Sequence, residues 1–102
     1  MDPYVKLANA IIIQAARDYQ TALCTVSLYE GIEHELVLHE KLAAEGKVKQ
    51  DKVVERKLAA LRSARADKTE IEDFFHSHLY STLTDVDGDL ILKRLQEEVN
   101  RK

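Results

Sequence analysis

The charged residues of positions 30–66 form two blocks of opposite sign on either side of Gly46. Residues 30–45 carry five acids and one base, a net charge of −4, and residues 46–66 carry seven bases and two acids, a net charge of +5. The whole chain contains one Pro and three Gly, so it has few places to turn. If the chain folds back at Gly46, the two blocks lie side by side and attract each other. The pattern therefore predicts an antiparallel helical hairpin.

The composition indicates a single folded domain over residues 1–102. Hydrophobic residues make up 45% of the chain and charged residues 32%, which is typical of a folded, helix-rich protein. The longest apolar run, Ala10 to Ile13, is far shorter than a membrane span needs, and no secretory leader is expected. A single cysteine fits a reducing cytoplasm. The net charge of −3 gives no electrostatic reason to expect nucleic-acid binding.

Apolar residues recur at helical spacing along most of the chain. They predict a helix over about 3–44, a second over about 51–77, a short turn at 78–83 and a last helix over about 85–100. The expected fold is all-α and coiled-coil-like: a long antiparallel helical hairpin with the short C-terminal helix packed at its open end. A bend at Gly31 remains an alternative to one straight first helix, because Gly weakens a helix interior.

Capping residues predict where these helices begin and end. Asp2 before Pro3 is typical of a helix start, and Asp51 is a suitable N-cap for the second helix. Gly46 fits a helix stop. Thr84 is expected to cap the last helix, with an acid three residues later.

The second helix is too short to cover the first along its whole length. Residues 5–16, which include Ile11, Ile12 and Ile13, keep an apolar face that the C-terminal helix or a second copy has to cover. A homodimer is therefore expected.

Two acidic pairs suggest an alternative function. Glu30 with Glu33, and Glu70 with Asp73, each lie three residues apart and so share a helix face. This arrangement resembles the Mg²⁺-binding pairs of all-α NTP pyrophosphohydrolases, whose oxygen ligands suit Mg²⁺. Acids at this spacing are also common in any Glu-rich helix, so no metal, cofactor or catalytic residue is expected as the first interpretation.

The remaining polar motifs favour structural roles. His34 and His39 lie on different helix faces, and the His76-x-His78 pair is expected at the surface rather than on zinc. Cys24 is expected as a small buried residue. Residues 67–89 carry seven acids against one base. The expected partner-binding acidic face consists of Glu70, Asp73, Asp85, Asp87 and Asp89.

The segment Phe74 to Val99 resembles the C-terminal module of a known protein family. The likeness rests on the pair Phe74-Phe75, on Ser77, and on Leu83 to Gly88 followed by a Leu-Ile helix. The family consists of small all-helical proteins of unknown function from Firmicutes prophages and integrative mobile elements. The resemblance implies a mobile-element protein that works in the cytoplasm of a bacterial host.

Three functional hypotheses follow. The favoured one is a non-catalytic protein that binds a host or phage protein, one version being an inhibitor of a nucleic-acid-handling or defence machine. The first alternative is the small Mg²⁺-dependent hydrolase that would use Glu30, Glu33, Glu70 and Asp73. The second alternative is a DNA-binding regulator, against which the net charge argues.

Overall fold

The computed structural model describes residues 2–101, and within this range the chain forms five helices and no strand. The helices are α1 (Pro3–Glu30), α2 (Glu33–Ala44), α3 (Lys52–Phe75), α4 (His78–Leu83) and α5 (Gly88–Asn100). The all-α prediction is confirmed. None of the described helices is both long and apolar enough to cross a membrane.

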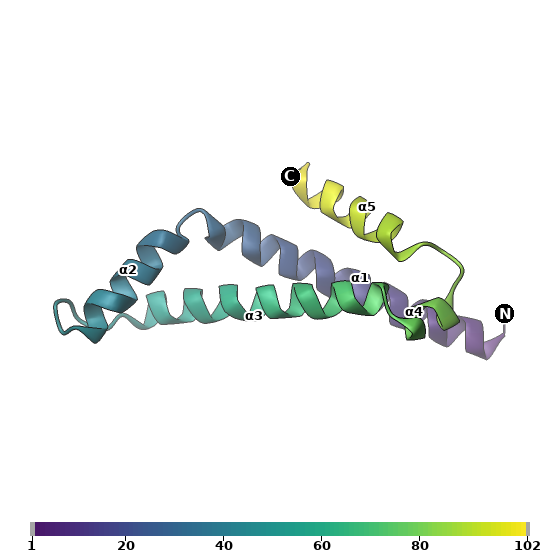
Figure 1. The fold of residues 1–102 in the computed structure, drawn as a ribbon, viewed down its shortest axis with the longest axis horizontal. Helices are drawn as coiled ribbons and strands as arrows, with labels where there is room; N and C mark the ends of the chain where they lie inside the picture. Colours follow the sequence, from purple (N-terminus) through teal and green to yellow (C-terminus); the bar gives the residue numbers. More distant parts are fainter. Residues whose placement is uncertain (1, 102) are drawn as a thin grey trace.

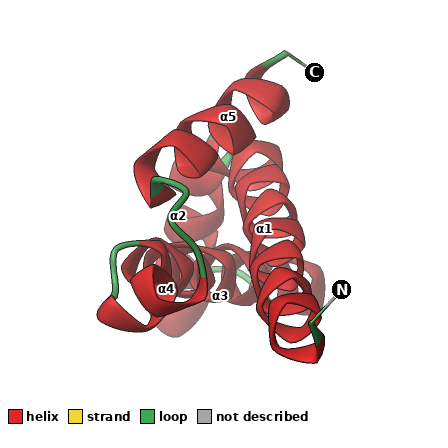
Figure 2. Cartoon of the chain, turned by 90° about the vertical axis from the view of Figure 1, so that its right-hand side faces the viewer, coloured by secondary structure: helices red, strands yellow, loops and turns green. Residues whose placement is uncertain are grey.

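The molecule is an elongated hairpin with a third helix over one end. Its principal extents are 61 × 25 × 20 Å, and α3 runs back along α1 while α2 packs on the first half of α3 (Figure 1). At the other end, α5 lies across α1 and α3, and α4 links it to them (Figure 2). The radius of gyration is 17.8 Å, whereas a compact chain of this length has about 13 Å.

Side-chain and backbone caps fix the ends of the hairpin helices as expected. Asp2 accepts the N–H of Tyr4 at 2.9 Å, and Asp51 accepts the N–H of Val53 at 2.8 Å. Gly46 adopts φ +76°, a left-handed conformation that Gly tolerates best. The N–H groups of Gly46 and Lys47 bond back to the carbonyls of Ala43 and Leu42. This pair of bonds is a Schellman motif, and it stops α2 at the predicted turn.

The expected single helix over 3–44 is wrong, and the alternative of a bend at Gly31 is correct. Residues Gly31 and Ile32 form a turn between α1 and α2. The N–H of Ile32 bonds to the carbonyl of Tyr29, three residues back, so the regular helical bonding is interrupted. After the turn, α2 packs on α3, and Leu36 of α2 is buried, as are Leu58 and Leu61 of α3.

The start of the last helix also differs from the prediction. Thr84 does not cap α5; its hydroxyl accepts the N–H of Val86 at 3.2 Å within the preceding turn. Asp87 is the N-cap instead and accepts the N–H of Asp89 at 3.0 Å. Ser77 caps α4, which occupies the predicted short turn.

The main hydrophobic core lies where α1, α3, α4 and α5 meet. Its buried members are Tyr19, Phe75, Tyr80, Leu92 and Leu95. The rings of Phe74, Phe75 and Tyr80 pack against one another with centroids 5.2–5.8 Å apart. Aromatic contacts of this geometry stabilise the junction beyond the effect of area burial.

The C-terminal helix covers only part of the apolar face of residues 5–16. Ile12 packs against the core, but Ile11 and Ile13 stay 40% and 51% exposed. Tyr4 and Leu7 are also exposed. The expected cover by the C-terminal helix is therefore incomplete.

Candidate helix-docking groove

An open groove of about 780 Å³ lies between α1 and α3. All of its lining residues come from these two helices, and α5 packs elsewhere on the pair (Figure 2). The floor is made of small and apolar side chains: Ile11, Ala15, Ala22, Ala60, Ala64, Ile71 and Phe74. Small side chains in the floor let another helix approach closely.

The polar lining of the groove is acidic. Asp18 of α1 and Asp67 and Glu70 of α3 contribute three carboxylates, and none of the lining residues is a lysine or arginine. The other polar lining residues are neutral: Gln14, Thr21, Thr25 and Ser63. The groove therefore suits an apolar helix stripe flanked by basic residues.

Helical periodicity explains why these residues share one face. The α1 lining residues run from Ile11 to Thr25 and the α3 lining residues from Ala60 to Phe74, in both cases at steps of three, four and seven. Alanine and threonine have short side chains, so at these positions the surface along the two helices stays hollow.

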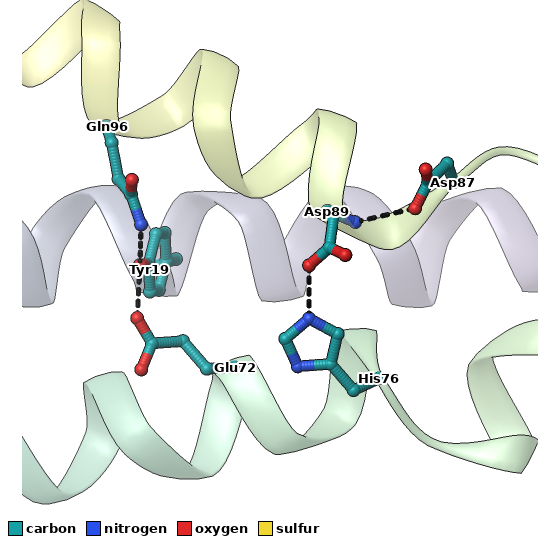
Figure 3. A network of polar contacts seen from close by, with 6 residues as sticks. All are labelled: Tyr19, Glu72, His76, Asp87, Asp89 and Gln96. Carbon is teal, nitrogen blue, oxygen red and sulfur yellow. Dashed lines mark hydrogen bonds and ion pairs between the residues drawn. The ribbon is translucent and has the colours of Figure 1, made fainter.

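A polar network links α1, α3 and α5 (Figure 3). The hydroxyl of Tyr19, a fully buried residue of α1, donates to Glu72 of α3 at 2.6 Å. Gln96 of α5 donates to the same hydroxyl at 2.9 Å. Lys68 lies 3.1 Å from Glu72, so the carboxylate has two partners. This network orients α5 relative to the α1–α3 pair.

Burial, together with the bond to Glu72, raises the pKa of Tyr19 from 10.0 to about 12. Burial also acts to raise the pKa of Glu72, but the bonds from Tyr19 and Lys68 outweigh it, and the pKa of this carboxyl lies below its ordinary value of 4.5. The network therefore favours a neutral phenol and an ionised carboxylate.

The four acids of the metal-site alternative are not brought together. Glu33 forms a two-pronged ion pair with Arg65, whose bond lowers the pKa of Glu33. Glu30 borders a separate hollow beneath the C-terminal end of α5, and Glu70 lines the groove. Asp73 is exposed. Among residues 2–101, no three His, Cys, Asp or Glu side chains are grouped as a metal site requires.

The five residues of the predicted acidic face are all exposed. Glu70 faces the groove, whereas Asp85 and Asp87 border a hollow beside α4. Asp87 is used as the cap of α5, and Asp89 bonds to His76. Two of the five acids thus already have partners within the chain (Figure 3).

The histidine and cysteine predictions have mixed outcomes. His76 is at the surface, as expected, and its bond to Asp89 raises its pKa above 6.5. His34 is exposed and His39 is half-buried. The buried role expected of Cys24 is wrong, because this side chain is exposed. Cys24 lies on α1 away from both the groove lining and the main core.

Sequence reasoning did not identify the groove. The available signal was the combination of Ala15, Ala22, Ala60 and Ala64 at inward positions with Asp18 between the first two. Small residues at core positions indicate either close helix packing or a gap, and the sequence alone does not distinguish them.

Comparison of the chain with protein-family models, curated proteins and solved structures finds no match to any of them.

Proposed function

We propose that this chain is a non-catalytic interaction protein whose α1–α3 groove docks a helix of another polypeptide chain. The observation that carries the proposal is the groove itself, about 780 Å³ in volume with an apolar floor of small residues. Apolar grooves between helices are common docking sites for an amphipathic helix.

The cellular setting is part of the same proposal. The likeness of residues 74–99 to mobile-element proteins supports a phage or integrative-element protein that acts in the bacterial cytoplasm. The exposed acids Asp73 and Asp85, which line no part of the groove, would offer a second surface to a basic protein.

The hydrolase alternative has weaker support. The four carboxylates that it requires lie apart, and Glu33 is neutralised by Arg65. The DNA-binding alternative would use the C-terminal helices, but α5 carries three acids, Asp89, Glu97 and Glu98, against the two bases Lys93 and Arg94.

Photo-crosslinking in bacterial cells tests the docking proposal. A photoreactive amino acid replaces Ser63, which lines the groove, or Ala66, an exposed control on the same helix outside the groove. We expect protein adducts from position 63 and not from position 66. Mass spectrometry then identifies each adduct as a second copy or a different protein.

A matched pair of substitutions provides the second arm of the test. Ala60→Arg places a long side chain in the groove, whereas Ala59→Arg adds the same charge at an exposed position outside it. Only Ala60→Arg should abolish the adducts from position 63. Equal yields from positions 63 and 66, or equal effects of the two arginines, would contradict docking in the groove.

A further inference from the structure

We infer that a second copy of this chain covers the groove face, packed antiparallel about a two-fold axis that passes near Thr21 and Ser63. This inference rests on the proposed function, because it names the occupant of the same groove. In the resulting dimer, α1 lies on α1 and α3 on α3, each pair running in opposite directions.

The surface area of one chain fits a partner of this size. The chain exposes 7430 Å², whereas a folded monomer of 11.6 kDa exposes about 5,800 Å². The surplus is larger than the roughly 800 Å² that each partner buries in a standard protein interface. A second copy has the same 61 Å length, and so it can cover this surface from end to end.

Apolar residues extend the groove face beyond the groove at both ends. Tyr4 and Leu7 continue the α1 stripe at helical spacing from Ile11 and are 57% and 61% exposed. Val53, 53% exposed, continues the α3 stripe at the opposite end. A short helix from another protein would leave these ends uncovered.

The charges of α3 determine the direction of packing. Residues 52–65 carry five bases and one acid, and residues 66–75 carry four acids and one base. This order opposes the helix macrodipole, which favours acids at the start of a helix and bases at its end. The acids of α2 offset part of the basic half, through Glu33 with Arg65 and Glu40 with Arg62. An antiparallel α3 places the basic half of one copy beside the acidic half of the other.

One pair of residues makes this complementarity specific. Arg56 and Glu70 lie seven residues on either side of Ser63, so an axis near Ser63 places Glu70 opposite Arg56 of the second copy. Neither side chain has an ion-pair partner within residues 2–101. In the parallel alternative, α1 of one copy would lie on α3 of the other, so Asp67 would face Asp18 of the second copy, and like charges would repel.

Two charge reversals test the inference by sedimentation velocity at low ionic strength, with reductant present so that the exposed Cys24 forms no disulfide. The wild type should sediment at twice 11.6 kDa. Glu70→Arg and Arg56→Glu should each weaken dimerisation about tenfold, because a like-charge pair replaces an attractive pair at two symmetry-related places. An equimolar mixture of the two variants should recover wild-type affinity, because both pairs are attractive again in the mixed dimer.

A second measurement locates the axis. In a Cys24→Ser background, Ser63→Cys should form a disulfide-linked dimer under mild oxidation, whereas Ala66→Cys should not. Circular dichroism checks that every variant remains helical.

The outcomes separate this inference from the proposed function. If the wild type sediments as a monomer of 11.6 kDa throughout the micromolar range, the inferred homodimer is wrong. In that case, if the photoreactive residue at position 63 crosslinks to a different protein, the docking proposal still holds. If it crosslinks to no protein, both the docking proposal and the inferred dimer are wrong. If the mixture of the two variants dimerises no more tightly than either variant alone, the antiparallel arrangement is wrong.

Discussion

Gly88, the first residue of α5, packs directly on the carbonyl group of Phe75 near the end of α3. A Cβ atom at position 88 would lie 2.2 Å from the Phe75 oxygen and 3.0 Å from its carbonyl carbon. Both atoms belong to the backbone, so they cannot move aside as a flexible side chain would. This contact sets how closely α5 approaches the end of α3.

Gly88→Ala should therefore destabilise the protein by about 1–3 kcal/mol, the usual cost of overpacking. Urea denaturation followed by circular dichroism measures the change. The matched control is Gly31→Ala, where the added methyl group would meet nothing within 4 Å beyond its neighbours along the chain and φ is −66°. Alanine there should be neutral or stabilising by up to about 1 kcal/mol. The same loss of stability in both variants would contradict the close approach at Gly88.

Leu58→Ala should cost about 2–5 kcal/mol, because Leu58 is only 1% exposed. Its neighbour Lys57 has no ion-pair partner in the described part of the chain, so Lys57→Ala should change stability by less than about 0.5 kcal/mol. Denaturation midpoints at one fixed protein concentration compare the two variants, since association would otherwise shift both. The reverse order would show that charge rather than apolar packing holds the hairpin.

Tyr19→Phe should destabilise the junction of α1, α3 and α5 by about 1.5–3 kcal/mol, because the removed hydroxyl bonds to a charged carboxylate. The wild type should also lose stability as the pH rises from 10 to about 12. A phenol whose pKa is raised on folding contributes its full stability below its unfolded pKa and loses it through the folded one.

Ultraviolet absorbance of tyrosinate measures this titration directly. The wild type should show one tyrosine ionising near pH 12, and Tyr19→Phe should lack that step. Tyr4→Phe, at an exposed position, is the control and should retain it. If the step near pH 12 survives in Tyr19→Phe, the assignment to the buried network is wrong.

His76 should titrate above its ordinary pKa of 6.5 because Asp89 bonds to its ring. The sign follows from linkage: any stability that the pair adds is complete below pH 6.5 and is lost as the pH rises through the raised pKa. Nuclear magnetic resonance of the imidazole signals gives the pKa. Asp89→Asn should lower it, whereas Asp85→Asn, which removes an acid without contact to His76, should leave it unchanged.

The helices themselves were predictable because their signals are local. The spacing of apolar residues, Asp2 and Asp51 as caps, and Gly46 at the turn depend on neighbours within a few residues along the chain. The opposite charge blocks added one long-range relation, the fold-back at Gly46. Each of these features agrees with the structure.

Tertiary structure alone decided the features that depend on how the helices are rotated and spaced. The chain bends at Gly31, and Leu36 beyond the bend is buried. Asp87 rather than Thr84 caps α5, where Gly88 packs on Phe75. The ion pair of Glu33 with Arg65, which occupies the carboxylate proposed as a metal ligand, is likewise visible only in the tertiary structure. The groove also depends on tertiary structure. The sequence indicates which helix face each alanine occupies, but it does not give the spacing and rotation of α1 and α3, which decide whether that face is filled or hollow.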